Sequence, residues 1–103
     1  MNTLLSEKRT DLAALCRRHG VTRLEVFGSA ARGGDFGLHS DIDLLVTFSP
    51  ETRNDLAGFV DLKDALEALL GRPVDLVERE AVEASRNPIR RRRILDEAEP
   101  VYG

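Results

Sequence analysis

Two aspartates at the start of an apolar strand constrain this chain more than any other feature of its sequence. Asp41 and Asp43 flank Ile42, and the apolar residues Leu44-Leu45-Val46 follow directly. Because side chains at i and i+2 project from the same face of a strand, the two carboxylates share one side of it. Charges held against a buried strand need a compensating partner, and a divalent cation supplies one. The sequence therefore predicts a fold with a cation site at the beginning of this strand.

A glycine-serine turn and a third aspartate complete the candidate site. Gly28 and Ser29 follow one apolar run, and Asp75 lies near the start of a later one. Gly28 allows close approach of a phosphate to the backbone, Ser29 offers a hydroxyl, and a helix beginning after them offers free N–H groups. Arg32 carries a guanidinium that could neutralise further phosphate charge. The three aspartates and this turn together predict a phosphate and magnesium site.

The composition is that of one small globular domain covering residues 1–103. Its net charge of −3 argues against non-specific binding of nucleic acid by the whole surface. The single cysteine excludes an internal disulfide and is compatible with a reducing cytoplasm. No run of about 18 apolar residues is present, so no membrane span is expected.

Hydrophobic periodicity and turn residues divide the chain into helices and strands. The expected strands cover 21–27, 42–48 and 73–78, and the last residues, 100–103, are expected to be extended. The expected helices are one capped by Thr3 or Ser6 and ending near His19, a brief one at 30–32, one over Asp55–Leu70, and one from Asn87-Pro88 to about Ala98. Glycines 33, 34 and 37 indicate a loop.

A shared site for the three acids dictates how the strands run. Gly28-Ser29 ends the first strand and Asp41 and Asp43 begin the second, so these two strands must be antiparallel neighbours. Asp75 also begins its strand, so the second and third strands must be parallel, with the helix at 55–70 as the crossover. The expected fold class is α/β (α+β), a small mixed sheet with about four helices packed on it.

The chemistry of such a site favours nucleotidyl transfer. Three clustered carboxylates raise one another's pKa unless a cation neutralises them, and magnesium prefers carboxylate and phosphate oxygens. Two such ions about 3.5–4 Å apart could hold an attacking and a leaving oxygen in line. These parts suit transfer of a nucleotidyl group from a triphosphate.

The residues Gly28-Ser29, the run Ser-Asp-Ile-Asp-Leu-Leu-Val at 40–46 and Val-Asp-Leu-Val at 74–77 resemble the DNA polymerase β-like nucleotidyltransferase superfamily. The short chain and the Gly-Ser-Ala-Ala-Arg-Gly form at 28–33 look more narrowly like the minimal nucleotidyltransferases, the MNT antitoxins that partner HEPN ribonuclease toxins. The resemblance covers nearly the whole chain, including the late segment at 89–102.

This resemblance implies a role for each candidate residue. Asp41 and Asp43 would hold two Mg²⁺ ions, and Asp75 would complete the site and help to activate the acceptor. Gly28 and Ser29 would hold the triphosphate. In the family, which forms type VII-like toxin–antitoxin pairs, a toxin tyrosine receives one or more AMP units from ATP with release of pyrophosphate. The implied protein is a cytoplasmic protein adenylyltransferase that binds a HEPN toxin and ATP, without direct binding of nucleic acid.

Several interpretations stay open at this stage. A non-catalytic antitoxin that shelters its toxin by contact, and an antibiotic-modifying nucleotidyltransferase, are the alternative functions. Arg32 is either a phosphate contact or a member of a surface ion pair. His39, in the glycine loop near the acids, is either a solvated loop residue, which is favoured, or a metal or phosphate contact. The four arginines at 90–93 spread around a helix, which favours a solvated or partner-facing surface over contact with RNA or an acidic partner.

Overall fold

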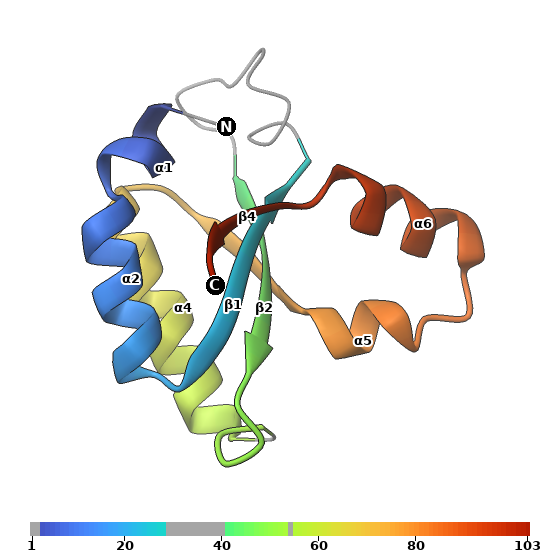
Figure 1. Cartoon of the computed structure of the whole chain (residues 1–103), viewed down its shortest axis with the longest axis horizontal. Coiled ribbons are helices and arrows are strands. Elements are labelled where there is room, and N and C mark those ends of the chain that lie inside the picture. The colour runs from blue at the N-terminus through green and yellow to red at the C-terminus, as the bar shows by residue number, and fades with distance from the viewer. Residues whose placement is uncertain (1–2, 29–40, 54) are drawn as a thin grey trace.

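The computed structural model describes residues 3–28, 41–53 and 55–103. Its described strands form one sheet in the order β3-β2-β1-β4 (Figure 1). The strands are β1 (Val21–Phe27), β2 (Ile42–Phe48), β3 (Val74–Glu78) and β4 (Glu99–Tyr102). β1 pairs antiparallel with β2 and β4, whereas β2 pairs parallel with β3. The directions expected for the first three strands are thus confirmed.

Helices cover both faces of this sheet. The described helices are α1 (Thr3–Glu7), α2 (Arg9–Arg18), α4 (Leu56–Leu70), α5 (Arg79–Glu83) and α6 (Pro88–Glu97). Figure 1 shows α1, α2 and α4 on one side of the sheet and α5 and α6 on the other. In the part of the chain that the structure describes, no helix combines the length and apolarity needed to cross a bilayer.

The central strand β2 is buried on both faces because each face meets a separate apolar cluster. Leu44 and Val46 belong to the larger cluster, which α1, α2 and α4 cover, and Leu45 belongs to the smaller one beneath α5 and α6. This is why three consecutive apolar residues occur in one strand. Cys16 lies in the larger cluster, where burial raises the pKa of its thiol to about 11, so the group packs as an uncharged core residue.

The ends of α4 and α6 agree with the capping signals in the sequence. The Asp55 carboxylate accepts a hydrogen bond from the Gly58 N–H at 3.0 Å, and Gly71 ends α4 with a φ of 68°. The Asn87 side chain accepts a bond from the Arg90 N–H at 3.1 Å, and proline follows at the first helical position. Both helices therefore begin and end close to where the sequence predicts.

The N-terminal helix differs from expectation because it is divided. Lys8 adopts φ −96° and ψ 10°, outside the α-helical region, so the hydrogen-bond ladder stops there. It starts again where the Leu12 N–H donates to the Lys8 carbonyl at 2.8 Å. Ser6, one of the two expected caps, lies inside α1 instead. The predicted apolar stripe still holds, since Leu5 and Leu12 are both buried.

Two further differences concern short elements. The five-residue helix α5 was not predicted, because one turn and a half is too short to show a hydrophobic period. The extended C-terminal segment is the edge strand β4, which pairs with β1. The brief helix expected at 30–32 and the glycine loop after it lie outside the described residues.

Candidate active site

The register between β2 and β3 places two of the expected acids side by side. Asp43 lies directly opposite Asp75 in the parallel pairing, and the Ile42 N–H donates to the Pro73 carbonyl at 3.0 Å where the two strands begin. Side chains of paired residues project to the same face of a sheet. Leu45, two residues after Asp43, contacts the cluster beneath α5 and α6. The two carboxylates therefore project to the face that these helices cover.

The end of β1 lies beside the Asp43 carboxylate. Phe27 pairs with Asp43 across the β1–β2 ladder, and Gly28 follows with a φ of 72°. A Cβ atom built on Gly28 would collide with the Asp43 carboxylate. Glycine is needed here for two reasons, a left-handed backbone and the close approach of a charged side chain. The close approach seen at Gly28 is that of the Asp43 carboxylate, and the approach of a phosphate to this glycine stays a prediction.

One cavity of about 410 Å³ connects these residues to helix α6. Its lining residues are Phe27, Gly28, Asp43, Asp75, Arg90, Arg93, Ile94 and Glu97. The structure therefore brings together Gly28, Asp43 and Asp75, as the sequence predicts.

Charged residues of α6 also line the cavity. For the four arginines of this helix, the sequence favoured a solvated or partner-facing surface. Arg90, Arg93, Ile94 and Glu97 follow the spacing i, i+3, i+4 and i+7, which is one face of a helix. Ile94 is the buried member of that face. Taking Ile94 as the anchor would have found the two arginines, because they are its neighbours on the same helical stripe.

The remaining predicted residues have different outcomes. Asp41 is exposed, directly before the first residue of β2, and is not among the residues that line the cavity. Over residues 3–28, 41–53 and 55–103, no three His, Cys, Asp or Glu side chains come together as a metal-binding group. The structure thus brings together Asp43 and Asp75 and leaves Asp41 beside them, one step outside the ladder. Ser29, Arg32 and His39 lie outside the described residues.

A glutamate on α4 fixes the start of β3. The Glu67 carboxylate accepts a hydrogen bond from the Val74 N–H at 2.9 Å and lies 3.4 Å from the Lys63 ammonium. The Val74 bond, together with Lys63, lowers the pKa of Glu67 although desolvation opposes the shift. Since Val74 precedes Asp75, this bond ties the third aspartate to the crossover helix.

A buried ion pair supports the same face of the sheet one row further along β1. Glu25 is 2% exposed, and the Arg79 Nη1 donates to its carboxylate at 2.6 Å. The hydrogen bond that Arg79 donates to Glu25 is the main cause that raises the pKa of Arg79. Arg23 approaches the same carboxylate at 3.4 Å. The pair joins the first residue of α5 to β1, and no pattern in the sequence indicated it.

We expect Gly28→Ala to destabilise the protein more than Gly71→Ala. Both glycines have a positive φ, 72° and 68°. Both substitutions therefore carry a similar backbone penalty of about 1 kcal/mol. A Cβ at Gly71 meets nothing within 4 Å, whereas a Cβ at Gly28 meets the Asp43 carboxylate. Urea unfolding of the two variants measures the difference, and equal losses would mean that the Asp43 contact costs nothing to displace.

Comparison with known proteins gives consistent matches over most of the chain. The family model of the nucleotidyltransferase domain matches residues 10–101. A Thermococcus cleftensis protein named protein adenylyltransferase MntA is 43% identical over 70 residues, which cover 68% of this chain and 68% of the relative. A Methanocaldococcus jannaschii protein whose name assigns it to the protein adenylyltransferases is 35% identical over 94 residues, covering 91% of this chain and 94% of that protein.

Solved structures agree with the fold. A structure described as a minimal nucleotidyltransferase has a TM-score of 0.75 at 41% identity and covers 97% of this chain and 96% of that chain. A chain from the complex of the tri-AMPylated Shewanella oneidensis HEPN toxin with an MNT antitoxin has a TM-score of 0.64 at 18% identity, covering 96% of this chain and 72% of that chain. At 18% identity, the second likeness supports the fold alone.

Proposed function

This chain belongs to the nucleotidyltransferase domain family, and on that premise we propose that it is an antitoxin that adenylylates its toxin. The reaction moves AMP from ATP to a tyrosine of a HEPN ribonuclease and releases pyrophosphate. Modification of the tyrosine silences the ribonuclease. The name of the Thermococcus cleftensis relative, protein adenylyltransferase MntA, supports the chemistry. The toxin partner is proposed by analogy with the Shewanella oneidensis complex, whose likeness to this chain is one of fold.

The observation that carries this proposal is the meeting of Gly28, Asp43 and Asp75 in one cavity. The three residues come from the end of β1, from β2 and from β3, and the cross-strand register alone puts the two acids opposite each other. Carboxylate oxygens are the donors that Mg²⁺ prefers, so the donor set fits that cation. We assign Asp41, which is exposed two residues before Asp43, as the third acid of the metal set.

Each residue has a defined task in this scheme. Mg²⁺ held by Asp41, Asp43 and Asp75 would neutralise the triphosphate and polarise the phosphorus that is attacked. The tyrosine oxygen forms a bond to the α-phosphorus, and the bond from that phosphorus to the bridging oxygen breaks. The electron pair leaves with pyrophosphate. Asp75 accepts the tyrosine proton, directly or through water, as the general base.

The turn after β1 serves the triphosphate. In this proposal Gly28 keeps the backbone close to the acids, the Ser29 hydroxyl and the following N–H groups bind phosphate oxygens, and Arg32 adds a guanidinium. The nucleotide is ATP, and two Mg²⁺ ions bind with it. The chain works in the cytoplasm, where ATP and the ribonuclease target of its partner are both present.

The test is a transfer reaction with purified components. The protein is incubated with a HEPN toxin encoded beside it, Mg²⁺ and ATP labelled in the α-phosphate, and the toxin is then analysed by intact mass. We expect a mass increase of one or more AMP units on a tyrosine, with loss of ribonuclease activity. Absence of any label on the toxin, in a complex that forms normally, would overturn the proposal.

A second candidate function is neutralisation by binding alone. Among the described residues, Leu56 and Val60, 75% and 48% exposed, lie one turn apart on α4, and Ile89, 80% exposed, lies on α6 on the other side of the sheet. A protein partner that covers the Leu56 and Val60 pair would remove this apolar surface from water. Under this interpretation, neutralisation would persist when the candidate catalytic acids are replaced. Modification of an antibiotic in the absence of any toxin would instead favour a small-molecule nucleotidyltransferase.

A further inference from the structure

We propose that Arg90 and Arg93 of α6 bind the phosphate tail of the nucleoside triphosphate in the candidate active site. This inference rests on the proposed function, because it says which residues of that same site bind the phosphates that leave as pyrophosphate. It concerns a helix near the C-terminal end of the chain, far in sequence from the Gly28 and Asp43 that face it across the cavity.

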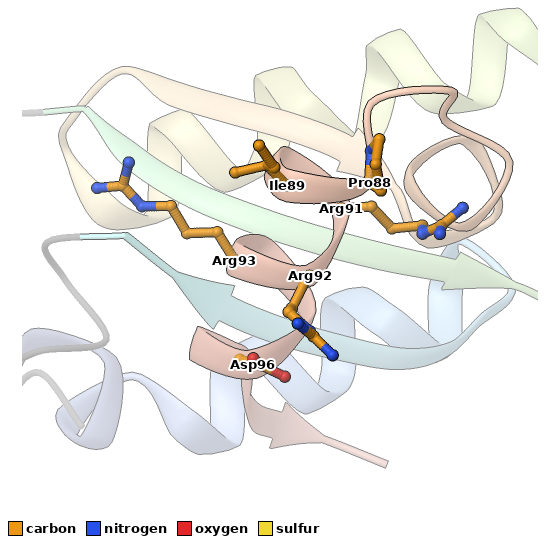
Figure 2. A pocket seen from close by; sticks show the side chains of 6 residues that line it. All are labelled: Pro88, Ile89, Arg91, Arg92, Arg93 and Asp96. Atoms are coloured by element: carbon orange, nitrogen blue, oxygen red, sulfur yellow. The ribbon is translucent and has the colours of Figure 1, made fainter.

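The orientation of α6 places these two arginines, and not Arg91 or Arg92, in the cavity that contains the acids. Ile94 anchors α6 on the small apolar cluster, so its neighbours on the same stripe, Arg90 and Arg93, line the cavity with Asp43 and Asp75. Figure 2 shows Arg93 extending toward the end of the sheet where β2 begins, while Arg92 points in another direction.

A second cavity beside α6 shares Arg93 with the first but is also lined by the other two arginines of the run. A cavity of about 640 Å³ on the outer side of α6 is lined by Arg91, Arg92 and Arg93 together with Pro88, Ile89 and Asp96 (Figure 2). Neither Arg91 nor Arg92 lines the cavity that holds the acids. Of the four consecutive arginines, two are therefore placed to contact a ligand at the acids.

Once a cation is bound, the charges in the site favour binding of an anionic ligand. The cavity contains the carboxylates of Asp43, Asp75 and Glu97 and the guanidinium groups of Arg90 and Arg93. Divalent cations on the aspartates would reverse the local sign, after which the two guanidinium groups add to a positive field. A triphosphate carries several negative charges on adjacent phosphates, so it complements this positive surface better than a neutral ligand does.

Both guanidinium groups are also able to move onto a ligand. The Arg93 Nε lies 3.7 Å from the Glu97 carboxylate, and the Arg93 side chain is 73% exposed. Breaking so exposed a pair costs little. Within the described parts of the chain, the Arg90 guanidinium makes no ion pair, and its backbone N–H is held by Asn87. The helix is therefore fixed while the two side-chain heads remain available.

This placement has a consequence for the reaction as well as for binding. When the bond between the α-phosphorus and the bridging oxygen breaks, the electron pair and the new negative charge go to pyrophosphate. A guanidinium that already contacts these phosphates stabilises the charge as it develops. Arg90 and Arg93 should therefore assist departure of pyrophosphate while the acceptor proton goes to the general base.

The test measures binding of a probe that has only the phosphate tail. Inorganic tripolyphosphate and AMP are titrated calorimetrically, with Mg²⁺, into the wild type, Arg90→Gln, Arg93→Gln and the double variant. Arg92→Gln is the matched control, because it removes the same charge from the same helix outside the cavity. We expect each cavity variant to weaken tripolyphosphate binding about tenfold and the double variant about 100-fold. Binding by Arg92→Gln should stay within about twofold of the wild type.

The outcomes separate this inference from the proposed function. Equal weakening by Arg92→Gln would mean that only the general field of the helix attracts phosphate, and unchanged binding by the double variant, or no binding by the wild type, would also overturn the inference. Thermal unfolding confirms that all variants are folded. If no AMP reaches the toxin but the cavity variants alone weaken tripolyphosphate binding, the proposed function fails and the assignment of Arg90 and Arg93 to the phosphate tail stands. If AMP is transferred and the double variant binds as the wild type does, only this inference fails.

Discussion

Asp43→Asn is expected to lower the rate of AMP transfer at least about a thousandfold, a loss of several kcal/mol of transition-state stabilisation. Asparagine has nearly the shape of aspartate, so the close contact with Gly28 and the pairing opposite Asp75 are preserved. What is lost is one negative charge at the centre of the proposed metal site. A single-turnover assay with α-labelled ATP and the toxin measures the effect.

The same substitution should leave the protein folded, because asparagine keeps nearly the size of aspartate opposite Asp75, and thermal unfolding checks this. Asp61→Asn, at an exposed position of α4, is the matched control and should transfer AMP at the wild-type rate. An Asp43→Asn protein that keeps more than a tenth of the wild-type rate would contradict the assignment of Asp43 to the metal site.

The topology could be predicted because the acids carry information about strand direction. A functional site needs its members close together, and Asp41, Asp43 and Asp75 each lie at the beginning of a strand. Those ends and Gly28 come together when β1 and β2 run antiparallel and β2 and β3 run parallel, and the structure has these directions. Long-range pairing was therefore inferred from chemistry, where local hydrophobic patterns carry no such information.

Features that depend on a single tertiary contact could not be predicted in this way. Arg90 and Arg93 differ from Arg91 and Arg92 only in lying on the helical face that Ile94 anchors to the apolar cluster. Because all four residues are arginine, their sequence does not indicate which of them lie on that face. The break at Lys8 is likewise a backbone adjustment within a continuous helical pattern. In each case, the local sequence is compatible with two structures, and packing against the sheet selects one.

The buried pair of Glu25 and Arg79 is the second place where a large effect is expected. Arg79→Met should destabilise the protein by about 3–5 kcal/mol, because it leaves the Glu25 carboxylate buried on β1 without its main partner. Arg53→Met is a matched control, since Arg53 pairs with Glu80 at the same distance of 2.6 Å but both side chains are about half exposed. That substitution should cost about 1 kcal/mol or less.

A double-mutant cycle tests whether burial or distance sets the cost. Glu25→Leu combined with Arg79→Met removes both charges, and we expect it to recover most of the stability lost in Arg79→Met alone. Urea unfolding of the wild type, the two single variants and the double variant gives the coupling energy. Equal losses for Arg79→Met and Arg53→Met would contradict the argument. A large coupling energy between Glu25 and Arg79, together with a small loss in Arg53→Met, would mean that desolvation of Glu25, and not the 2.6 Å contact by itself, sets the cost of breaking the pair.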